Sequence, residues 1–229
     1  MANNVATIIR APHEVIEAIT DRKTISFNKI VPMPKKLASE EASFIDISAA
    51  FAAGIASHTV PHRRHLHCSA LTLNDDSFEA FIRYLRNKRE FGFFTPMCFM
   101  RSNWGVDSEP YWQNISKERI SFRTSNYHPY KIISQLSKMF PNELIEVEYA
   151  NEDIGRKCGS YTIKNGKVIK SREAPDEYGK DTIHILKKWR AFAFPIFDER
   201  SSPLDYDYDE DWNHIDDEEN YGCIPEKQA

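Results

Sequence analysis

Five side chains that could bind a metal ion lie within eleven residues, namely His58, His62, His65, His67 and Cys68. Imidazole and thiolate groups at short spacing can hold zinc or copper. Their spacing matches no standard zinc finger, however, and Pro61 interrupts the helix that would align the first two histidines. Arg63 and Arg64 would also place positive charge beside a bound cation. We therefore expect a strand over residues 64 to 73 and no bound metal, and we keep a metal-dependent enzyme as the third of three hypotheses.

Carboxylate pairs and nucleophile motifs give no stronger sign of catalysis. Asp107 with Glu109, and Glu152 with Asp153, fall in predicted loops among solvating neighbours. The sequence lacks the G-x-S-x-G elbow, the G-x-x-x-x-G-K-[ST] phosphate loop and the G-x-G-x-x-G fingerprint. We expect a protein that is not an enzyme and that uses no cofactor.

An acidic segment near the C-terminus is the most distinctive feature of the chain. Residues 205 to 219 hold nine of the 34 acidic residues and no Lys or Arg, so the rest carries 25 acidic against 30 basic residues, although the net charge is −4. Carboxylates speed encounter with a basic surface, and interleaved Tyr and Trp supply contact area. We expect residues 201 to 229 to be a mobile tail or to become ordered on binding, with a purely solubilising tail as the alternative. The predicted partner-binding residues are Asp205, Tyr206, Asp207, Tyr208, Asp209, Glu210, Asp211, Trp212, Asp216, Asp217, Glu218, Glu219 and, from a separate loop, Trp104.

A basic helix is predicted over residues 77 to 90. Phe78, Phe81, Ile82 and Leu85 lie at helical spacing and form its apolar stripe. Its cationic face could bind phosphates, although four basic residues on an amphipathic helix commonly form only a solvated face, and no aromatic motif of the RNA-recognition type is present. The predicted nucleic-acid contacts are Arg63, Arg64, Arg83, Arg86, Lys88 and Arg89.

The composition indicates a globular protein. The chain has 229 residues, 41% of them hydrophobic, which is enough for a substantial core. Apolar runs are far shorter than the roughly 20 residues that a membrane-spanning helix requires. No secretory signal is visible at the N-terminus, and the four cysteines are widely spaced and form no C-x-x-C pair. We expect no membrane association and a location in the cytoplasm.

The hydrophobic pattern predicts two strand–helix–strand halves. In the first, residues 5–9 and 24–28 are strands, and Val15, Ile16 and Ile19 line the helix between them. In the second, strands at 120–124 and 144–149 flank a helix between Pro129 and Pro141. The apolar face of this helix is formed by Ile132, Ile133, Leu136 and Met139.

Further elements surround these halves. Asn165-Gly166 predicts a type I′ turn in a hairpin over residues 159–170, because both residues tolerate positive φ. A last helix over 181–189 is expected to turn Ile183, Leu186 and Trp189 inward. Two helices, over 38–57 and 77–90, form an insertion. The sequence thus predicts an α+β fold: a ferredoxin-like, split βαβ core over residues 1–200, with a helical insertion over 36–100 and an acidic aromatic tail over 201–229.

Several segments together resemble the YubB-type, ferredoxin-like accessory proteins of phages and conjugative plasmids. They are the opening strand, the run from Phe27 to Pro34, the tripeptide Asn103-Trp104-Gly105, and the strand at 120–124 before a helix ending in Phe140-Pro141. The chain departs from the family where Val106-Asp107-Ser108 replace its Thr-Lys-Trp, so no role of that loop carries over. The resemblance implies mobile-element cargo, often encoded beside genes that blunt host defences, so the expected cytoplasm is that of a host cell.

Two further hypotheses therefore rank above the metal-dependent enzyme. The leading one is a mobile-element protein that binds and inhibits a host defence complex, such as a CRISPR effector, by occupying a basic surface of a protein or ribonucleoprotein. The alternative is a nucleic-acid-binding accessory protein that uses the basic helix.

Overall fold

The computed structural model describes residues 3–39, 75–179 and 182–215, and it divides the chain into two compact units. The first unit comprises Met1–Val31 and Gly105–Ala229, and the second comprises Pro32–Trp104. None of the described helices is long and apolar enough to cross a membrane.

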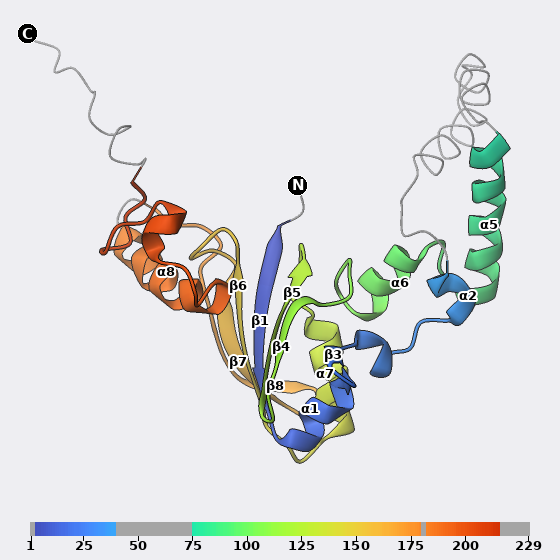
Figure 1. Cartoon of the computed structure of the whole chain (residues 1–229), viewed down its shortest axis with the longest axis horizontal. Coiled ribbons are helices and arrows are strands. Elements are labelled where there is room, and N and C mark those ends of the chain that lie inside the picture. The colour runs from blue at the N-terminus through green and yellow to red at the C-terminus, as the bar shows by residue number, and fades with distance from the viewer. Residues whose placement is uncertain (1–2, 40–74, 180–181, 216–229) are drawn as a thin grey trace, which may run out of the picture. The chain divides into compact units, whose positions relative to one another are not determined.

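The first unit is built on a six-stranded sheet in the order β4-β5-β1-β6-β7-β8, in which every neighbouring pair is antiparallel (Figure 1). The helix α1, His13–Ile19, follows β1, and α7, Tyr130–Met139, joins β5 to β6. The strands are β1 Asn4–Arg10, β4 Tyr111–Ile115, β5 Arg119–Ser125, β6 Ile145–Asn151, β7 Gly159–Lys164 and β8 Lys167–Glu173.

This topology confirms the predicted ferredoxin-like fold. Because β5 is antiparallel to both of its neighbours, β1 and β4 run parallel with β5 between them, and β5 and β6 likewise flank β1. Each half is therefore a split βαβ unit. Between β1 and β4, however, the chain leaves the sheet to form the second unit.

The second strand of the first half was predicted in the wrong place. In the predicted strand 24–28, only Thr24–Ile25 form a strand, β3, which pairs with the two-residue β2, Thr20–Asp21; Phe27–Lys29 form a 3-10 turn, η1. The alternating pattern misled because Ile25 and Phe27 are both buried without being part of a longer strand. The edge position of the sheet belongs to β4, which the sequence analysis missed.

The main core lies between the sheet and α1 with α7. Alternate residues of the strands face these helices, as in β1, where Thr7 and Ile9 are fully buried beside Phe122 and Ile120 of β5. On α7 the predicted apolar face is confirmed for Ile132, Ile133 and Leu136, whereas Met139 is 52% exposed.

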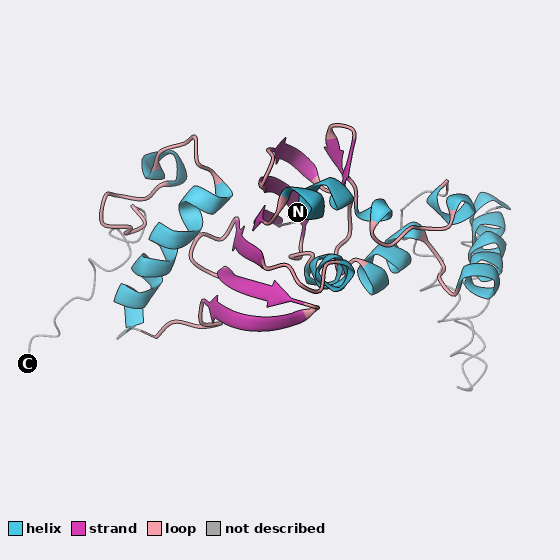
Figure 2. Cartoon of the chain, turned by 90° about the horizontal axis from the view of Figure 1, so that it is seen from below, coloured by secondary structure: helices cyan, strands magenta, loops and turns pink. Residues whose placement is uncertain are grey.

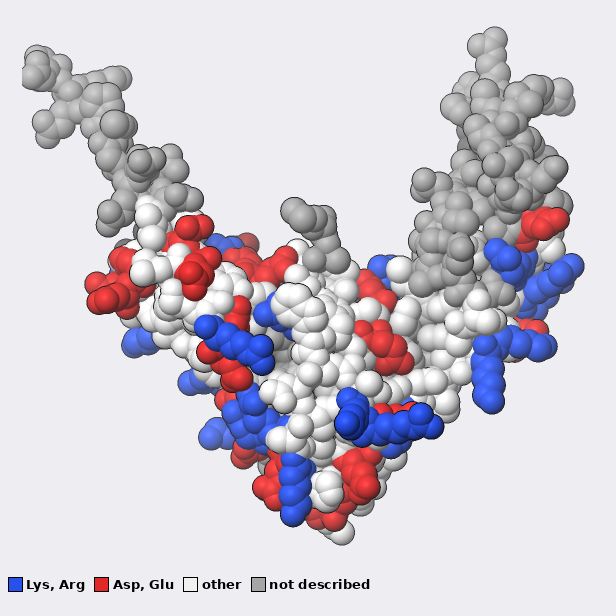
Figure 3. Space-filling view, in the orientation of Figure 1, with Lys and Arg blue, Asp and Glu red and all other residues white. Residues whose placement is uncertain are grey.

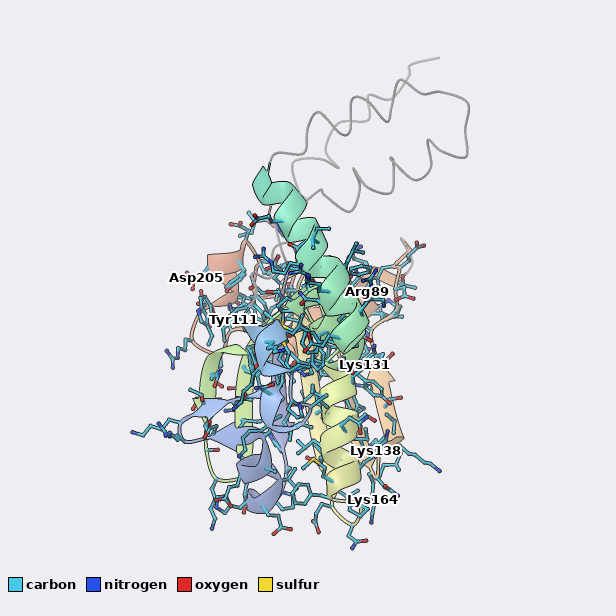
Figure 4. All side chains as sticks on the ribbon, turned by 90° about the vertical axis from the view of Figure 1, so that its right-hand side faces the viewer. Arg89, Tyr111, Lys131, Lys138, Lys164 and Asp205 are labelled. Atoms are coloured by element: carbon cyan, nitrogen blue, oxygen red, sulfur yellow. The ribbon has the colours of Figure 1, made fainter. Side chains whose placement is uncertain are left out.

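The hairpin β7–β8 is confirmed, and its turn has the predicted conformation. Asn165 and Gly166 have φ values of 47° and 71°, as a type I′ turn requires. The Ser137 hydroxyl accepts a hydrogen bond from the Gly166 N–H at 3.1 Å, which fastens the turn to α7. Figure 4 shows Lys131 and Lys138 along α7, with Lys164 at the end of β7.

The last helix is longer than predicted. α8 runs over Ile183–Phe197 and covers part of the sheet face opposite α1 and α7 (Figures 1 and 2). Of the residues predicted to face inward, Leu186 is buried, Trp189 is partly buried and Ile183 is 50% exposed.

The described part of the predicted tail packs on α8. Residues 203–206 form a 3-10 turn, η3, and an isolated bridge pairs Tyr208 with His214. Tyr208 joins a buried cluster with Ala6, Ala150 and Phe194, so residues 201–215 contribute to the core of the first unit. The described part is thus ordered by contacts within the chain.

The second unit is helical where it is described. It contains α2, Lys35–Ala38, α5, Asp75–Phe91, and α6, Pro96–Asn103. The predicted basic helix is therefore confirmed as α5. Of the helix predicted over 38–57, only the first two residues are described, and the strand expected over 64–73 lies outside the described residues.

Candidate functional site

The sheet face opposite α1 and α7 is only partly covered, and it carries polar and charged side chains. The same alternation that turns Thr7 and Ile9 to the helices leaves Ala6, Ile8 and Arg10 on the opposite face. There the Arg10 guanidinium pairs with the Glu148 carboxylate of the neighbouring strand at 2.6 Å. This face therefore presents paired charges beside the area that α8 covers.

A stacked arginine lies at the centre of the uncovered area. The Arg123 guanidinium is 4.2 Å from the ring centroid of Trp112 and 4.3 Å from that of Phe197. Its Nη2 donates a hydrogen bond of 2.7 Å to the Phe197 carbonyl oxygen. These contacts fix the guanidinium between two aromatic rings.

Trp112 is held outward by the irregular backbone of β4. The register of β4 against β5 shifts between Tyr111 and Asn114, and Trp112 has a φ of 48°. Its side chain is 75% exposed although it stacks on Arg123. A large aromatic ring is thus presented to solvent in a fixed orientation.

A cleft of about 550 Å³ lies beside this stack, between strands β1, β4 and β5 and residues 195–201. It is lined by charges of both signs: Arg119 and Glu199, whose side chains lie 3.4 Å apart, and Asp198 with Arg200. Burial opposes ionisation of Asp198, but hydrogen bonds from the Arg200 and Ser201 N–H groups and from the Ser201 and Tyr206 hydroxyls outweigh it and lower the pKa of its carboxyl.

The segment after the cleft forms an acidic cap, defined here as residues 201–215. Asp205 closes the start of η3 by accepting hydrogen bonds from the Ser202 N–H at 2.7 Å and the Ser202 hydroxyl at 3.1 Å. Asp209 accepts from the N–H and side-chain amide of Asn213, and these bonds hold the pKa of Asp209 below its usual value. Figure 3 shows acidic side chains gathered over this end of the first unit. The exposed carboxylates of the cap are those of Asp205, Asp207, Glu210 and Asp211.

The aromatic residues predicted to contact a partner instead hold the cap on α8. Tyr206 and Trp212 both pack against Phe194, with ring centroids 5.4 Å away in each case. Tyr208 is only 8% exposed, and the Arg190 guanidinium lies 4.8 Å from its ring centroid. Aromatic side chains and carboxylates thus face opposite sides of the cap, because the rings bury apolar area against α8 and the carboxylates remain hydrated. Asp216, Asp217, Glu218 and Glu219 lie outside the described residues.

The remaining predicted site residues belong to the second unit. Trp104, predicted as a partner contact, is 2% exposed and packs edge-on against Phe99 at 5.9 Å, so it contributes to the interior of that unit. Arg83, Arg86, Lys88 and Arg89 are exposed on α5, and Figure 4 labels Arg89. Arg63, Arg64 and the histidine cluster lie outside the described residues.

The loop carboxylates considered for catalysis have structural roles. Glu109 accepts a hydrogen bond from the Phe27 N–H at 3.1 Å, and burial raises the pKa of its carboxyl. Glu152 accepts hydrogen bonds from the backbone and side chain of Asn4 at 2.8 and 2.6 Å. Among the described residues, no group of three His, Cys, Asp or Glu side chains is arranged to hold a metal ion.

Neither Trp112 nor Arg123 was predicted from the sequence as a site residue. The signal available was the alternation in residues 119–125, where Arg, Ser, Arg and Ser occupy one face of a strand whose other face is apolar. That pattern identifies a polar sheet face, but only the paired register places Trp112 over Arg123.

Comparison with known proteins supports the fold. Residues 109–192, from just before β4 into α8, match a family model described as a ferredoxin-like domain in Api92-like protein. The crystal structure of the protein Api92 from Yersinia pseudotuberculosis aligns with 78% of this chain and 100% of its own, at 10% identity and a TM-score of 0.34, too low to establish a shared fold by itself. No curated protein matches the chain. Residues 109–192 are thus similar to the ferredoxin-like domain of Api92-like proteins.

Proposed function

We propose that the chain is a non-enzymatic binding protein that docks on a basic protein surface through Trp112 and the acidic cap. The observation that carries this proposal is that Trp112 is 75% exposed yet stacked on a fixed arginine. Tryptophan and arginine are the residues most often found at energetically dominant positions of interfaces. A ring held in place before binding also loses little conformational entropy when it is buried.

The acidic cap supplies the electrostatic part of the interaction. Its four exposed carboxylates lie on a folded segment that continues from the lining of the cleft beside Trp112. Carboxylates clustered on a rigid surface accelerate the encounter with a basic partner and disfavour the binding of acidic partners. The cap therefore favours a basic partner over a nucleic acid at this face.

For the partner, we propose a nuclease complex of host defence, such as a CRISPR effector, inhibited by a protein of a mobile element. The nucleic-acid groove of such a complex is basic and open to an acidic surface that carries a projecting aromatic ring. The chain would then act by occupying the groove.

Matched variants test this proposal. Trp112→Ala and the quadruple variant D205N/D207N/E210Q/D211N should each reduce capture of a partner from host lysate, with identification by mass spectrometry. Tyr127→Ala, which removes another exposed aromatic residue of the same unit, is the control and should capture normally. The proposal fails if both site variants retain the proteins that the wild type captures, or if the captured complex cuts its nucleic acid equally well with and without the chain.

Nucleic-acid binding by the second unit is the second candidate, because α5 is formed and exposes the predicted cations. Contacts within the unit fix two cations near the end of α5: Lys88 lies 5.4 Å from the ring centroid of Phe94, and Lys36 pairs with Glu90 at 3.0 Å. A mobility-shift titration in increasing salt should show steeply weakening binding, since counterions are released. R86Q/R89Q should reduce both affinity and salt dependence. Binding that is insensitive to salt and to this variant would contradict the candidate.

A further inference from the structure

A second cavity, of about 440 Å³, lies at the other end of the sheet, on the face covered by α7. Its walls include Tyr130 at the start of α7, Tyr149 of β6, Tyr161 of β7 and Glu173 of β8, with His128 at its base. Tyr130 is 43% exposed and Val168, on the rim, is 40% exposed, so the cavity is open to solvent. It does not overlap the lining of the cleft beside Trp112.

The aromatic rings that line this cavity pack against one another in a cluster. The Tyr161 ring centroid lies 5.8 Å from that of Tyr130 and 6.3 Å from that of Tyr149, with interplanar angles of 60° and 59°. The His128 ring stacks on Tyr149 at 4.4 Å. Rings inclined to one another in this way present more than one π face to a bound group.

The strand register explains the position of Glu173, the only carboxylate among the described residues of the lining. Tyr149, Gly159 and Glu173 stand in one row across β6, β7 and β8. A Cβ atom at Gly159 would lie 3.1 Å from the Tyr149 hydroxyl and 2.6 Å from the Arg172 carbonyl oxygen, so only glycine leaves this path open. The Tyr149 hydroxyl accordingly lies over Gly159, and the Glu173 carboxylate beyond it adds to the larger effect of burial in raising the pKa of Tyr149.

The polar groups of the cavity leave it with negative charge. His128 Nδ1 lies 3.1 Å from the Thr7 hydroxyl and Nε2 lies 2.8 Å from the Tyr161 hydroxyl, so both ring nitrogens have partners. Burial holds the pKa of His128 at about 3 and raises the pKa values of Tyr149 and Tyr161, so all three side chains are neutral at pH 7. Glu173 is then the charged group, and the described lining contains no Lys or Arg.

We propose that this cavity is an aromatic cage for an alkylammonium group. Three tyrosine rings and one carboxylate are the combination by which proteins bind quaternary and methylated ammonium ions, since the π faces and the anion both attract a cation that sheds water easily. An anionic ligand would be repelled by Glu173. A neutral apolar ligand would gain nothing from the carboxylate.

Isothermal titration of the full chain with choline and with its neutral isostere 3,3-dimethylbutan-1-ol tests the cage. Choline should release heat and the isostere should bind at least about fivefold more weakly, because the shape is shared and only the charge differs. A third arm with Nε-trimethyl-lysine amide distinguishes the source of the ammonium group: tighter binding than choline indicates a lysine side chain, and equal binding indicates a free amine. Equal binding of choline and the isostere, or no binding of any of the three, would overturn the proposal.

Variants separate the cage from a general effect on folding. Tyr130→Phe keeps the ring and should bind choline as the wild type does, whereas Tyr130→Leu and Glu173→Gln should each weaken binding at least about fivefold. Glu177→Gln removes an equal charge from an exposed position outside the cavity and should leave the affinity unchanged. Amide NMR shifts on adding choline should map to residues 128–130, 159–161 and 173. Unchanged affinity in both weakening variants would refute the assignment.

Discussion

His128 and Tyr161 are joined by a hydrogen bond of 2.8 Å between Nε2 of the imidazole and the phenolic oxygen. The bond lies on the covered face of the sheet, where the Thr7 hydroxyl occupies the other ring nitrogen. The imidazole is buried at this position, and its removal from water explains why the folded protein disfavours the charged form.

The first prediction concerns this histidine and pH. Its pKa is 6.5 in an ordinary environment and about 3 when folded, so between these values the unfolded chain binds more protons than the folded one. Stability present above pH 6.5 should therefore be lost as the pH falls, at up to about 1.4 kcal/mol per pH unit from this residue. Urea unfolding of the wild type and His128→Gln between about pH 6 and 5 measures the difference in slope, because the carboxylates common to both proteins cancel. His184→Gln, at an exposed position, should keep the wild-type slope; an identical slope in His128→Gln would contradict the prediction.

The second prediction concerns the stacked arginine. Arg123→Ala removes two cation–π contacts and a hydrogen bond to the Phe197 carbonyl oxygen. The free energy of unfolding should fall by about 1–3 kcal/mol, and the fluorescence of Trp112 should change because the ring loses its support. Arg10→Ala, which removes only a surface ion pair, should cost less than about 1 kcal/mol. Equal losses in the two variants would mean that the stack contributes nothing beyond a surface charge.

The third prediction concerns the acidic cap. Truncation after residue 200 removes Tyr206 and Tyr208 and uncovers Phe194 and Phe197. The truncated protein should be destabilised and prone to aggregate, and Tyr208→Ala alone should lower the free energy of unfolding by about 2–4 kcal/mol. Differential scanning calorimetry checks both. Charge-neutralising substitutions of Asp207, Glu210 and Asp211 should leave the melting temperature nearly unchanged, which makes them better probes of partner binding than a deletion. An unaltered melting temperature after truncation would show that the segment does not pack on α8 in solution.

The fourth prediction concerns the hairpin turn. Gly166→Ala places a side chain at a φ of 71°, and its Cβ would meet the Lys138 side chain at 2.5 Å. The Lys138 side chain can move aside, so the expected loss of about 1 kcal/mol comes chiefly from the backbone conformation. Gly179→Ala is the control, since the nearest atom to its Cβ would be 3.9 Å away. Urea unfolding of both variants measures the contrast; equal stability would exclude the I′ turn.

Local patterns predicted the elements that depend on neighbouring residues. The Asn165-Gly166 turn, the apolar face of α7 and the helix α5 followed from turn chemistry and helical spacing, which act within a few residues. The strand predicted at 24–28 failed because burial of Ile25 and Phe27 satisfies the same alternation in a two-residue strand followed by a 3-10 turn.

The acidic segment shows which properties follow from local composition and which depend on tertiary contacts. Its composition indicated the exposed carboxylates, but the same composition could not show that Tyr206, Tyr208 and Trp212 find an apolar surface on α8. That contact depends on residues of β1, β6 and α8 that the fold alone brings together.

The sequence by itself determined the fold class, because the second βαβ half, the first strand and helix of the other half, and the hairpin are encoded in local periodicity. Only the tertiary structure decided where function could lie. Trp112 and Arg123, or Tyr149 and Glu173, meet through the register of strands distant in sequence, and register is set by how whole faces of the sheet are buried.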